Sequence, residues 1–293
     1  MPLLQAEGLV KRFRRRRLFS RNHSETLAVD GVSFELDRGK TLSVVGESGA
    51  GKSTTGRMVV RLIEPDEGSI RFDGVELTEL SAAELRKMRR KMQMIFQDPY
   101  SSCDPRIPIG LSVTEPLRVH EGINRSDRER KAVEVLDRVG LAAHYAERMP
   151  YELSGGQLQR VAIARALTVE PALIVCDEPV SALDVSVRAQ VLNLMLDLQE
   201  ERQMAFLFIS HDLSIVEAIS DHVAVMRSGR LVELGTKEQI YTAPSHEYTK
   251  QLLDAVPVAD PSRRVLTGRP SRAAGAPGPS GPRPAPVGVS RSG

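Results

Sequence analysis

The stretch Gly46-Glu47-Ser48-Gly49-Ala50-Gly51-Lys52-Ser53 decides the fold of this chain. It has the form G-x-x-x-x-G-K-[ST], in which glycines let successive backbone N–H groups turn toward one phosphate. Lys52 adds a positive charge for the outer phosphates, and Ser53, followed by Thr54, offers a hydroxyl to Mg²⁺. An apolar strand pattern precedes the loop and a helical pattern follows it. This order of elements predicts an α/β core that binds phosphate.

A second glycine-rich segment, Leu153-Ser154-Gly155-Gly156-Gln157, leads directly into a helical pattern. The N-terminus of a helix favours anions because its first N–H groups lack partners within the helix. The chain therefore carries two predicted phosphate-binding surfaces, and a nucleotide can be held between them.

Two carboxylates, Asp177 and Glu178, follow the short apolar run 172–176, which is typical of a buried parallel strand. Beside a phosphate-binding loop, Asp177 is suited to hold the Mg²⁺ shell. Glu178 is then placed to accept a proton from the attacking water. The alternative is that the pair only caps the next helix.

Three further residues are candidates for the same site. Gln97 ends a strand pattern and can touch both metal and water, although a surface turn residue is the alternative. His211 follows the apolar run 206–209 and can bind a γ-phosphate; a purely structural histidine is the alternative. Phe13 precedes the loop and is a candidate for stacking on adenine.

Composition places the chain among globular proteins. Its 293 residues are 41% apolar and 27% charged, and its formal charge of +2 creates no strong field that would favour nucleic acid. The two cysteines, Cys103 and Cys176, argue against a disulfide framework. The start is not typical of a signal peptide, and no apolar run is long enough to cross a bilayer.

Strand and helix patterns alternate along residues 3–256, which we interpret as one catalytic domain. The predicted strands are 3–8, 27–36, 41–45, 69–72, 93–96, 172–176, 205–209, 222–226 and 231–234. The predicted helices are 52–63, 82–90, 127–139, 156–167, 186–201, 213–220 and 247–255.

Three segments differ from this alternation. The helix-rich, proline-punctuated segment 99–150 is interpreted as an inserted helical subdomain. The basic run 11–17 is interpreted as a solvated loop, with contact to anionic lipid or an acidic partner as the alternative. Residues 257–293 are rich in Pro, Gly and Arg, and we expect them to be disordered.

Together these motifs resemble those of the ATP-hydrolysing subunits of ABC transporters. The resemblance covers 3–256 and implies a P-loop NTPase (RecA-like) core with an N-terminal antiparallel β subdomain and the inserted helical subdomain. The matching segments are the phosphate loop 46–53, Gln97, the signature 153–157, the strand 172–178, the segment Ser181-Ala-Leu-Asp184 and His211.

Several segments resemble the oligopeptide/dipeptide/nickel importer branch, in particular the second (F-type) of its two ATPases. They are Gln93-Met-Ile-Phe-Gln-Asp-Pro-Tyr-Ser-Ser102, Glu115-Pro-Leu-Arg-Val-His120 and Pro244-Ser-His-Glu-Tyr-Thr249. The branch implies import of peptides, although nickel or another small solute stays open.

The resemblance further implies a head-to-tail dimer in which Ser154, Gly155, Gly156 and Gln157 serve the partner's ATP, with Asp184 at the dimer seam. It implies two membrane-spanning permease subunits docked on 99–150, a second and different ATPase chain, an extracytoplasmic solute-binding protein and no nucleic acid. The expected location is peripheral, on the cytoplasmic face of the cell membrane. One departure is Leu158, where relatives often carry Arg; we expect a slight effect near the partner's γ-phosphate.

Two rival functions remain. One is a soluble, non-transport ABC-type ATPase that acts mechanically on nucleic acid or the ribosome; such proteins usually carry two nucleotide cores or a long coiled-coil insertion. The other is a regulatory subunit that binds ATP without turning it over, against which the presence of Glu178 and His211 argues.

Overall fold

The computed structural model describes residues 1–15, 24–100 and 102–255. The chain divides into two units, Met1–Ala259 and Asp260–Gly293, and the second lies outside the described residues, as does the predicted disordered tail. The strands are β1 (Leu4–Arg15), β2 (Ser24–Leu36), β3 (Thr41–Val45), β4 (Glu67–Phe72), β5 (Val75–Glu76), β6 (Met92–Ile95), β7 (Leu173–Asp177), β8 (Ala205–Ser210), β9 (His222–Arg227) and β10 (Arg230–Thr236).

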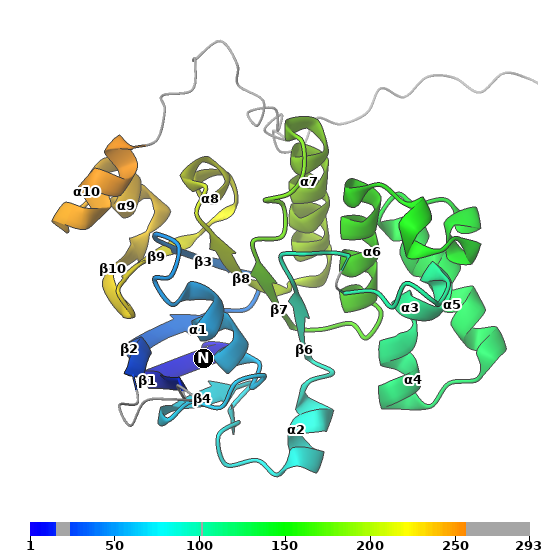
Figure 1. Cartoon of the computed structure of the whole chain (residues 1–293), viewed down its shortest axis with the longest axis horizontal. Helices are drawn as coiled ribbons and strands as arrows, with labels where there is room; N and C mark the ends of the chain where they lie inside the picture. The colour runs from blue at the N-terminus through cyan, green and yellow to red at the C-terminus, as the bar shows by residue number, and fades with distance from the viewer. Residues whose placement is uncertain (16–23, 101, 256–293) are drawn as a thin grey trace, which may run out of the picture. The chain divides into compact units, whose positions relative to one another are not determined.

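The helices lie between these strands along the chain and after the last of them, and α3 to α6 follow one another without a strand (Figure 1). They are α1 (Lys52–Val59), α2 (Ala82–Met88), α3 (Ile109–Val113), α4 (Glu115–Glu121), α5 (Arg125–Arg138), α6 (Gly155–Leu167), α7 (Val185–Arg202), α8 (Leu213–Ile219), α9 (Lys237–Thr242) and α10 (Glu247–Asp254). Two 3₁₀ turns, η1 (Ala143–Glu147) and η2 (Pro150–Glu152), lead into α6.

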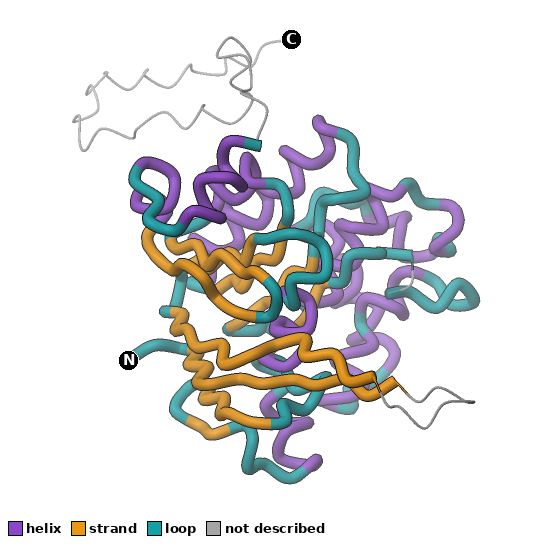
Figure 2. The backbone as a smooth tube through the Cα atoms, turned by 60° about the vertical axis from the view of Figure 1, so that its left-hand side comes forward, coloured by secondary structure: helices purple, strands orange, loops and turns teal. Residues whose placement is uncertain are grey.

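Two sheets make the framework, and both are visible as orange strands in Figure 2. The larger sheet has the order β10-β9-β3-β8-β7-β6, and its strands are parallel except for β10, which pairs antiparallel with β9. The smaller sheet, β2-β1-β4-β5, is antiparallel throughout. The predicted α/β class with an N-terminal antiparallel sheet is confirmed.

Apolar packing fixes the relation between the two sheets. Helix α1 contacts β1 and β2 of the smaller sheet as well as β7 and β8 of the larger one. Its buried Met58 and Val59 belong to a core cluster that includes residues of both sheets. A second cluster joins α3, α5, α6 and α7 to β6, β7 and β8. The phosphate-loop helix is therefore held between two layers.

The basic segment at the N-terminus corrects one interpretation. Lys11 to Arg15 is not a solvated loop, because it forms the second half of β1 and pairs with β2. Lys11 Nζ lies 2.9 Å from Asp66 Oδ1, and Arg12 lies 2.7 Å from Glu67. These carboxylates, one just before β4 and one at its first residue, compensate the positive charges of Lys11 and Arg12. The rest of the run, from residue 16, lies outside the described residues.

Most element boundaries moved by one to three residues, and two differences have a clear cause. The helix predicted over 52–63 ends at Val59 because the chain turns at Arg61, whose φ is 55°. Strand β5 and helix α9 were not predicted, and neither were helices α3 and α4. The latter two span five and seven residues in a segment where prolines conceal the helical pattern.

Candidate active site

The phosphate loop follows the central strand β3 and ends where α1 begins. Gly46 has φ 149°, and a Cβ there would lie 2.1 Å from the Met226 carbonyl oxygen, so a side chain is excluded. Lys52 is only 5% exposed, and its ammonium group donates to the carbonyls of Gly46 (2.7 Å) and Glu47 (2.8 Å). Burial lowers the pKa of Lys52, while the charges of Glu178 and Asp177 oppose that shift.

Asp177 ends β7 and is 2% exposed, close to the start of α1. Its carboxylate accepts a hydrogen bond from Ser53 Oγ at 2.6 Å and lies 3.5 Å from the Arg57 guanidinium. A hydroxyl and a carboxylate held together in this way are hard oxygen donors of the kind that Mg²⁺ prefers. The residues present therefore fit a magnesium ion.

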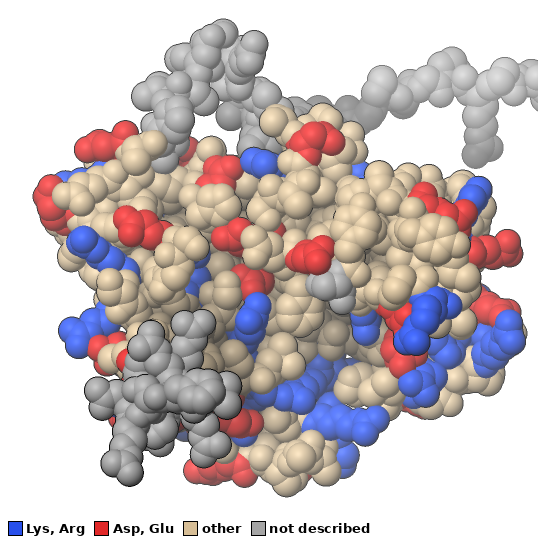
Figure 3. All heavy atoms as spheres, in the orientation of Figure 1, with Lys and Arg blue, Asp and Glu red and all other residues tan. Residues whose placement is uncertain are grey.

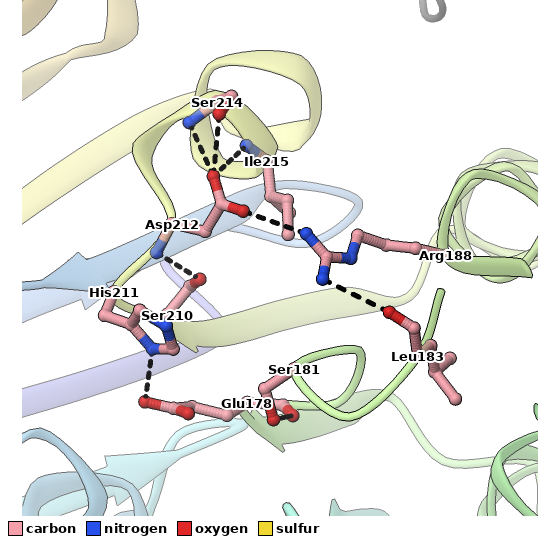
Figure 4. Close-up of polar contacts among 9 residues, drawn as sticks. All are labelled: Glu178, Ser181, Leu183, Arg188, Ser210, His211, Asp212, Ser214 and Ile215. Carbon is pink, nitrogen blue, oxygen red and sulfur yellow. Dashed lines mark hydrogen bonds and ion pairs between the residues drawn. The ribbon is translucent and has the colours of Figure 1, made fainter. Parts of the chain in front are cut away.

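Glu178 has the left-handed φ of 49°, which is uncommon for a residue with a side chain. Its carboxylate accepts from Gln97 Nε2 at 3.0 Å. It also lies 2.9 Å from His211 Nδ1, as Figure 4 shows. The side chain is 17% exposed, whereas His211 is 60% exposed. Backbone strain of this kind clusters at active sites, and here it aims the carboxylate between the amide and the imidazole.

One cavity of about 490 Å³ gathers most of the predicted residues. Its lining is Ala28, Ser48, Gly49, Gly51, Lys52, Ser53, Thr54, Gln97, Glu178 and His211. Gly46, Glu47, Ala50 and Asp177 support it from the loop and from β7 without lining it. Phe13 is 43% exposed, pairs with Thr26 and lies outside this lining, so its stacking on adenine stays a prediction.

The signature segment forms the N-terminus of α6. Ser154 and Gln157 make a reciprocal capping box, in which each side chain accepts from the backbone N–H of the other. By helix geometry, the N–H groups of Gly155 and Gly156 have no acceptor within α6. None of these four residues lines the cavity on the phosphate loop. Within one chain the two predicted phosphate-binding surfaces are therefore separate.

Asp184 caps α7 by accepting from the Val187 N–H at 2.9 Å. Hydrogen bonds from the Val187 backbone and the Ser186 hydroxyl lower the pKa of Asp184. Its neighbour Val185 is 67% exposed. Leu158, by contrast, is fully buried in the helical core, so it does not face a partner.

Sequence reasoning missed Arg57 and Arg188. Arg188 lies 3.1 Å from the Asp212 carboxylate and donates to the Leu183 carbonyl at 3.2 Å (Figure 4). It thus joins the segment after Glu178 to the segment after His211. A basic residue in the first turn of a helix does not by itself predict such a contact, because its partner is determined by the tertiary structure.

A larger groove of about 560 Å³ lies between β6 and α4, and neither Asp177 nor Glu178 lines it. Its lining includes the apolar Met94, Phe96 and Val119 and the basic Arg89 and Arg165. Beside it, Arg86, Lys87, Arg90 and Lys91 line a basic groove. Figure 3 shows Lys and Arg gathered on the lower part of the face in view. We place the chemistry in the smaller cavity, because it holds the phosphate loop and Glu178.

Comparisons with known proteins identify the family of the chain. Residues 29–181 match the ABC transporter family, and residues 232–280 match the oligopeptide/dipeptide transporter C-terminal region. The chain is 53% identical over 264 residues to the glutathione import ATP-binding protein GsiA of Pectobacterium atrosepticum, covering 90% of this chain and 42% of that protein. Over 272 residues it is 52% identical to GsiA of Escherichia coli, covering 92% and 43%. The chain thus spans about two-fifths of the length of these relatives.

Solved structures give the same result. A dimeric cassette, MJ0796, in a post-hydrolysis state bound to ADP and Pi, has a TM-score of 0.72 at 28% identity and covers 80% of this chain and 98% of its own. CbiO1 of Clostridium perfringens, part of the ABC transporter complex cbiONQ, has a TM-score of 0.70 at 26% identity and covers 83% and 91%. Among the described residues, no helix combines the length and the apolar character that a membrane span requires.

Proposed function

The chain belongs to the ABC transporter family, and from that premise we propose that it binds ATP between two protomers and hydrolyses it to drive solute import. The relatives named above are import ATP-binding proteins, which supports the direction of transport. The match at 232–280 to the oligopeptide/dipeptide transporter C-terminal region favours small peptides, with glutathione among them, as the imported class.

The cavity carries the proposed chemistry. Amide groups of the loop and Lys52 bind the β- and γ-phosphates, and Ser53, Asp177 and Gln97 would hold Mg²⁺. A bound ion would neutralise charge that develops on the phosphoryl oxygens. Glu178 accepts the proton of the attacking water, and Gln97 at 3.0 Å fixes the orientation of its carboxylate.

His211 contacts one carboxylate oxygen of Glu178, and Gln97 contacts the other. Its Nδ1 is engaged with that carboxylate at 2.9 Å, which leaves Nε2 as the nitrogen for the γ-phosphate. We infer that His211 links the base to the phosphate that is transferred.

The single observation that carries the proposal is the division of the site. The phosphate loop and Glu178 share one cavity, while the signature residues 154–157 do not line it. A second copy of the core would bring the two surfaces together, because the signature of one protomer then covers the cavity of the other. The solved MJ0796 cassette is a dimer, which supports this arrangement.

We further propose the partners. The groove between β6 and α4 opens next to the strand that leads to Gln97, so a permease segment seated there senses the nucleotide state through Gln97. Two permease subunits would place the chain peripherally on the cytoplasmic face of the membrane, with a second, different ATPase chain beside it. An extracytoplasmic solute-binding protein would deliver the solute.

ATP binding by Lys52→Ala tests the proposal. In the proposed complex the Lys52 ammonium donates to charged phosphate oxygens, and each such hydrogen bond is worth about 1.5–3 kcal/mol, so we expect ATP affinity to fall at least about 10-fold. Titration of each purified variant with MgATP measures this. Lys87→Ala, which removes a lysine of the basic groove, is the control and should bind ATP as the wild type does. Equal affinity in all three proteins would refute the phosphate site.

A further inference from the structure

Helix α10 reaches the phosphate loop from the C-terminal end of the described chain. We propose that Tyr248 of α10 is a positioning residue that holds the first peptide unit of the loop and thereby sets nucleotide affinity. This inference rests on the proposed function, because it concerns the same nucleotide site. Tyr248 lies in 232–280, the region matched to the oligopeptide/dipeptide transporters.

The first step of the argument is the contact itself. The Glu47 backbone N–H donates to the Tyr248 hydroxyl at 3.2 Å. The carbonyl of the same residue accepts from Lys52 Nζ at 2.8 Å. Glu47 is therefore held at its N–H from outside the loop and at its carbonyl from inside. A loop held in this way loses less conformational freedom when a phosphate arrives.

Tyr248 is itself fixed. Its side chain is 3% exposed, and the Arg227 guanidinium lies over the ring at 4.6 Å from its centroid. Arg227 ends β9, whose Met226 carbonyl packs against Gly46. The end of β9 and the tyrosine therefore support the same end of the loop.

A carboxylate in β10 anchors the start of α10. Glu233 accepts from the Ser245 N–H and hydroxyl, both at 2.7 Å, and from the His246 N–H at 3.1 Å. His246 caps the helix in turn by accepting from the Tyr248 N–H at 3.0 Å. This chain of contacts leaves Tyr248 little freedom to move away from the loop.

The alternative is that Tyr248 has only a packing role in the small core of β9, α8, α9 and α10. The two interpretations differ in the role that they give to the Tyr248 hydroxyl group. Packing depends on the ring, whereas the contact with Glu47 depends on the oxygen. Tyr248→Phe therefore removes the proposed role and keeps the packing.

The chain offers a matched control. Tyr241 of α9 belongs to the same core, and its hydroxyl donates to the Leu213 carbonyl at 2.5 Å and not to a residue of the phosphate loop. Tyr241→Phe also removes one hydroxyl and one hydrogen bond from this region. It reports what a general loosening of the C-terminal region does to the nucleotide site.

The experiment measures MgATP affinity of the full chain and hydrogen exchange of the Glu47 amide without nucleotide. In Tyr248→Phe we expect ATP affinity to fall about 2- to 10-fold and the Glu47 amide to exchange faster by a similar factor, the range for one lost hydrogen bond. In Tyr241→Phe we expect both quantities to match the wild type.

Three results would overturn the inference. One is wild-type affinity and amide exchange in Tyr248→Phe. Another is an equal loss in both variants, because the effect would then belong to the whole C-terminal region. The third is a wild-type chain that binds no ATP, which refutes the proposed function and removes the site with it. The first two leave the proposed function intact, so the failures are distinguishable.

Discussion

At the scale of single residues, Glu178 has the most specific surroundings in the site. Its backbone is in the left-handed region, and its two carboxylate oxygens are engaged by Gln97 and His211. These contacts orient a base toward the space above the phosphate loop.

Glu178→Gln preserves this shape and removes the proton acceptor. We expect ATP hydrolysis to fall about 10²-fold or more, because general-base catalysis is worth about 10²–10⁴ in rate. ATP binding should persist, and the nucleotide should trap a closed dimer that size-exclusion chromatography detects. Glu129→Gln, on the exposed face of α5, is the control that should retain the rate. Near-normal hydrolysis in Glu178→Gln would remove this residue from its role.

The sequence predicted the phosphate loop, Asp177 and Glu178 because their chemistry lies in short, contiguous patterns. It could not predict Tyr248, whose partner Glu47 is 201 positions away. It also missed Arg57 and Arg188, since surface-type residues gain their roles only when the fold brings a carboxylate to them. Local pattern thus predicts residue chemistry, while the supports of that chemistry depend on tertiary packing.

At the scale of elements, the segment that leads from α9 into α10 depends on one carboxylate. Burial opposes ionisation of Glu233, but hydrogen bonds from residues 245–249 lower its pKa to about 2 from an ordinary value of 4.5. The ionised form is therefore favoured in the folded state. Its contribution to stability is complete above about pH 4.5 and is lost as the pH falls toward about 2.

Glu233→Gln tests this anchor. The amide can still accept a hydrogen bond but carries no charge, so we expect the free energy of unfolding at pH 7 to fall by about 1 kcal/mol. The difference from the wild type should shrink as the pH falls from 4.5 toward 2. Urea unfolding at several pH values measures it. Glu247→Gln, an exposed carboxylate of α10, should change stability less, and a pH-independent difference for Glu233→Gln would contradict the anchor.

At the scale of the whole molecule, the two phosphate-binding surfaces have to meet through a second protomer. A crosslink between residues 48 and 155 tests this, because Ser48 lines the cavity and Gly155 begins the signature helix. A side chain at position 155 meets nothing within 4 Å in the single chain, so cysteine fits there. The native Cys103 and Cys176 are buried, which keeps background reaction low.

Two proteins make the test unambiguous. One carries Ser48→Cys together with Glu178→Gln, and the other carries Gly155→Cys together with Glu178→Gln. Neither protein alone can join position 48 to position 155, so a 48–155 crosslink in their mixture has to be intermolecular. We expect a short bifunctional thiol reagent to give crosslinked dimer in the mixture with MgATP and little without it, as read by gel and peptide mass. ATP supplies contacts that only the closed dimer makes, and this shifts the population toward closure. If the amount of crosslinked dimer were the same with and without MgATP, or if no dimer formed in the mixture, the signature would not complete the partner's site.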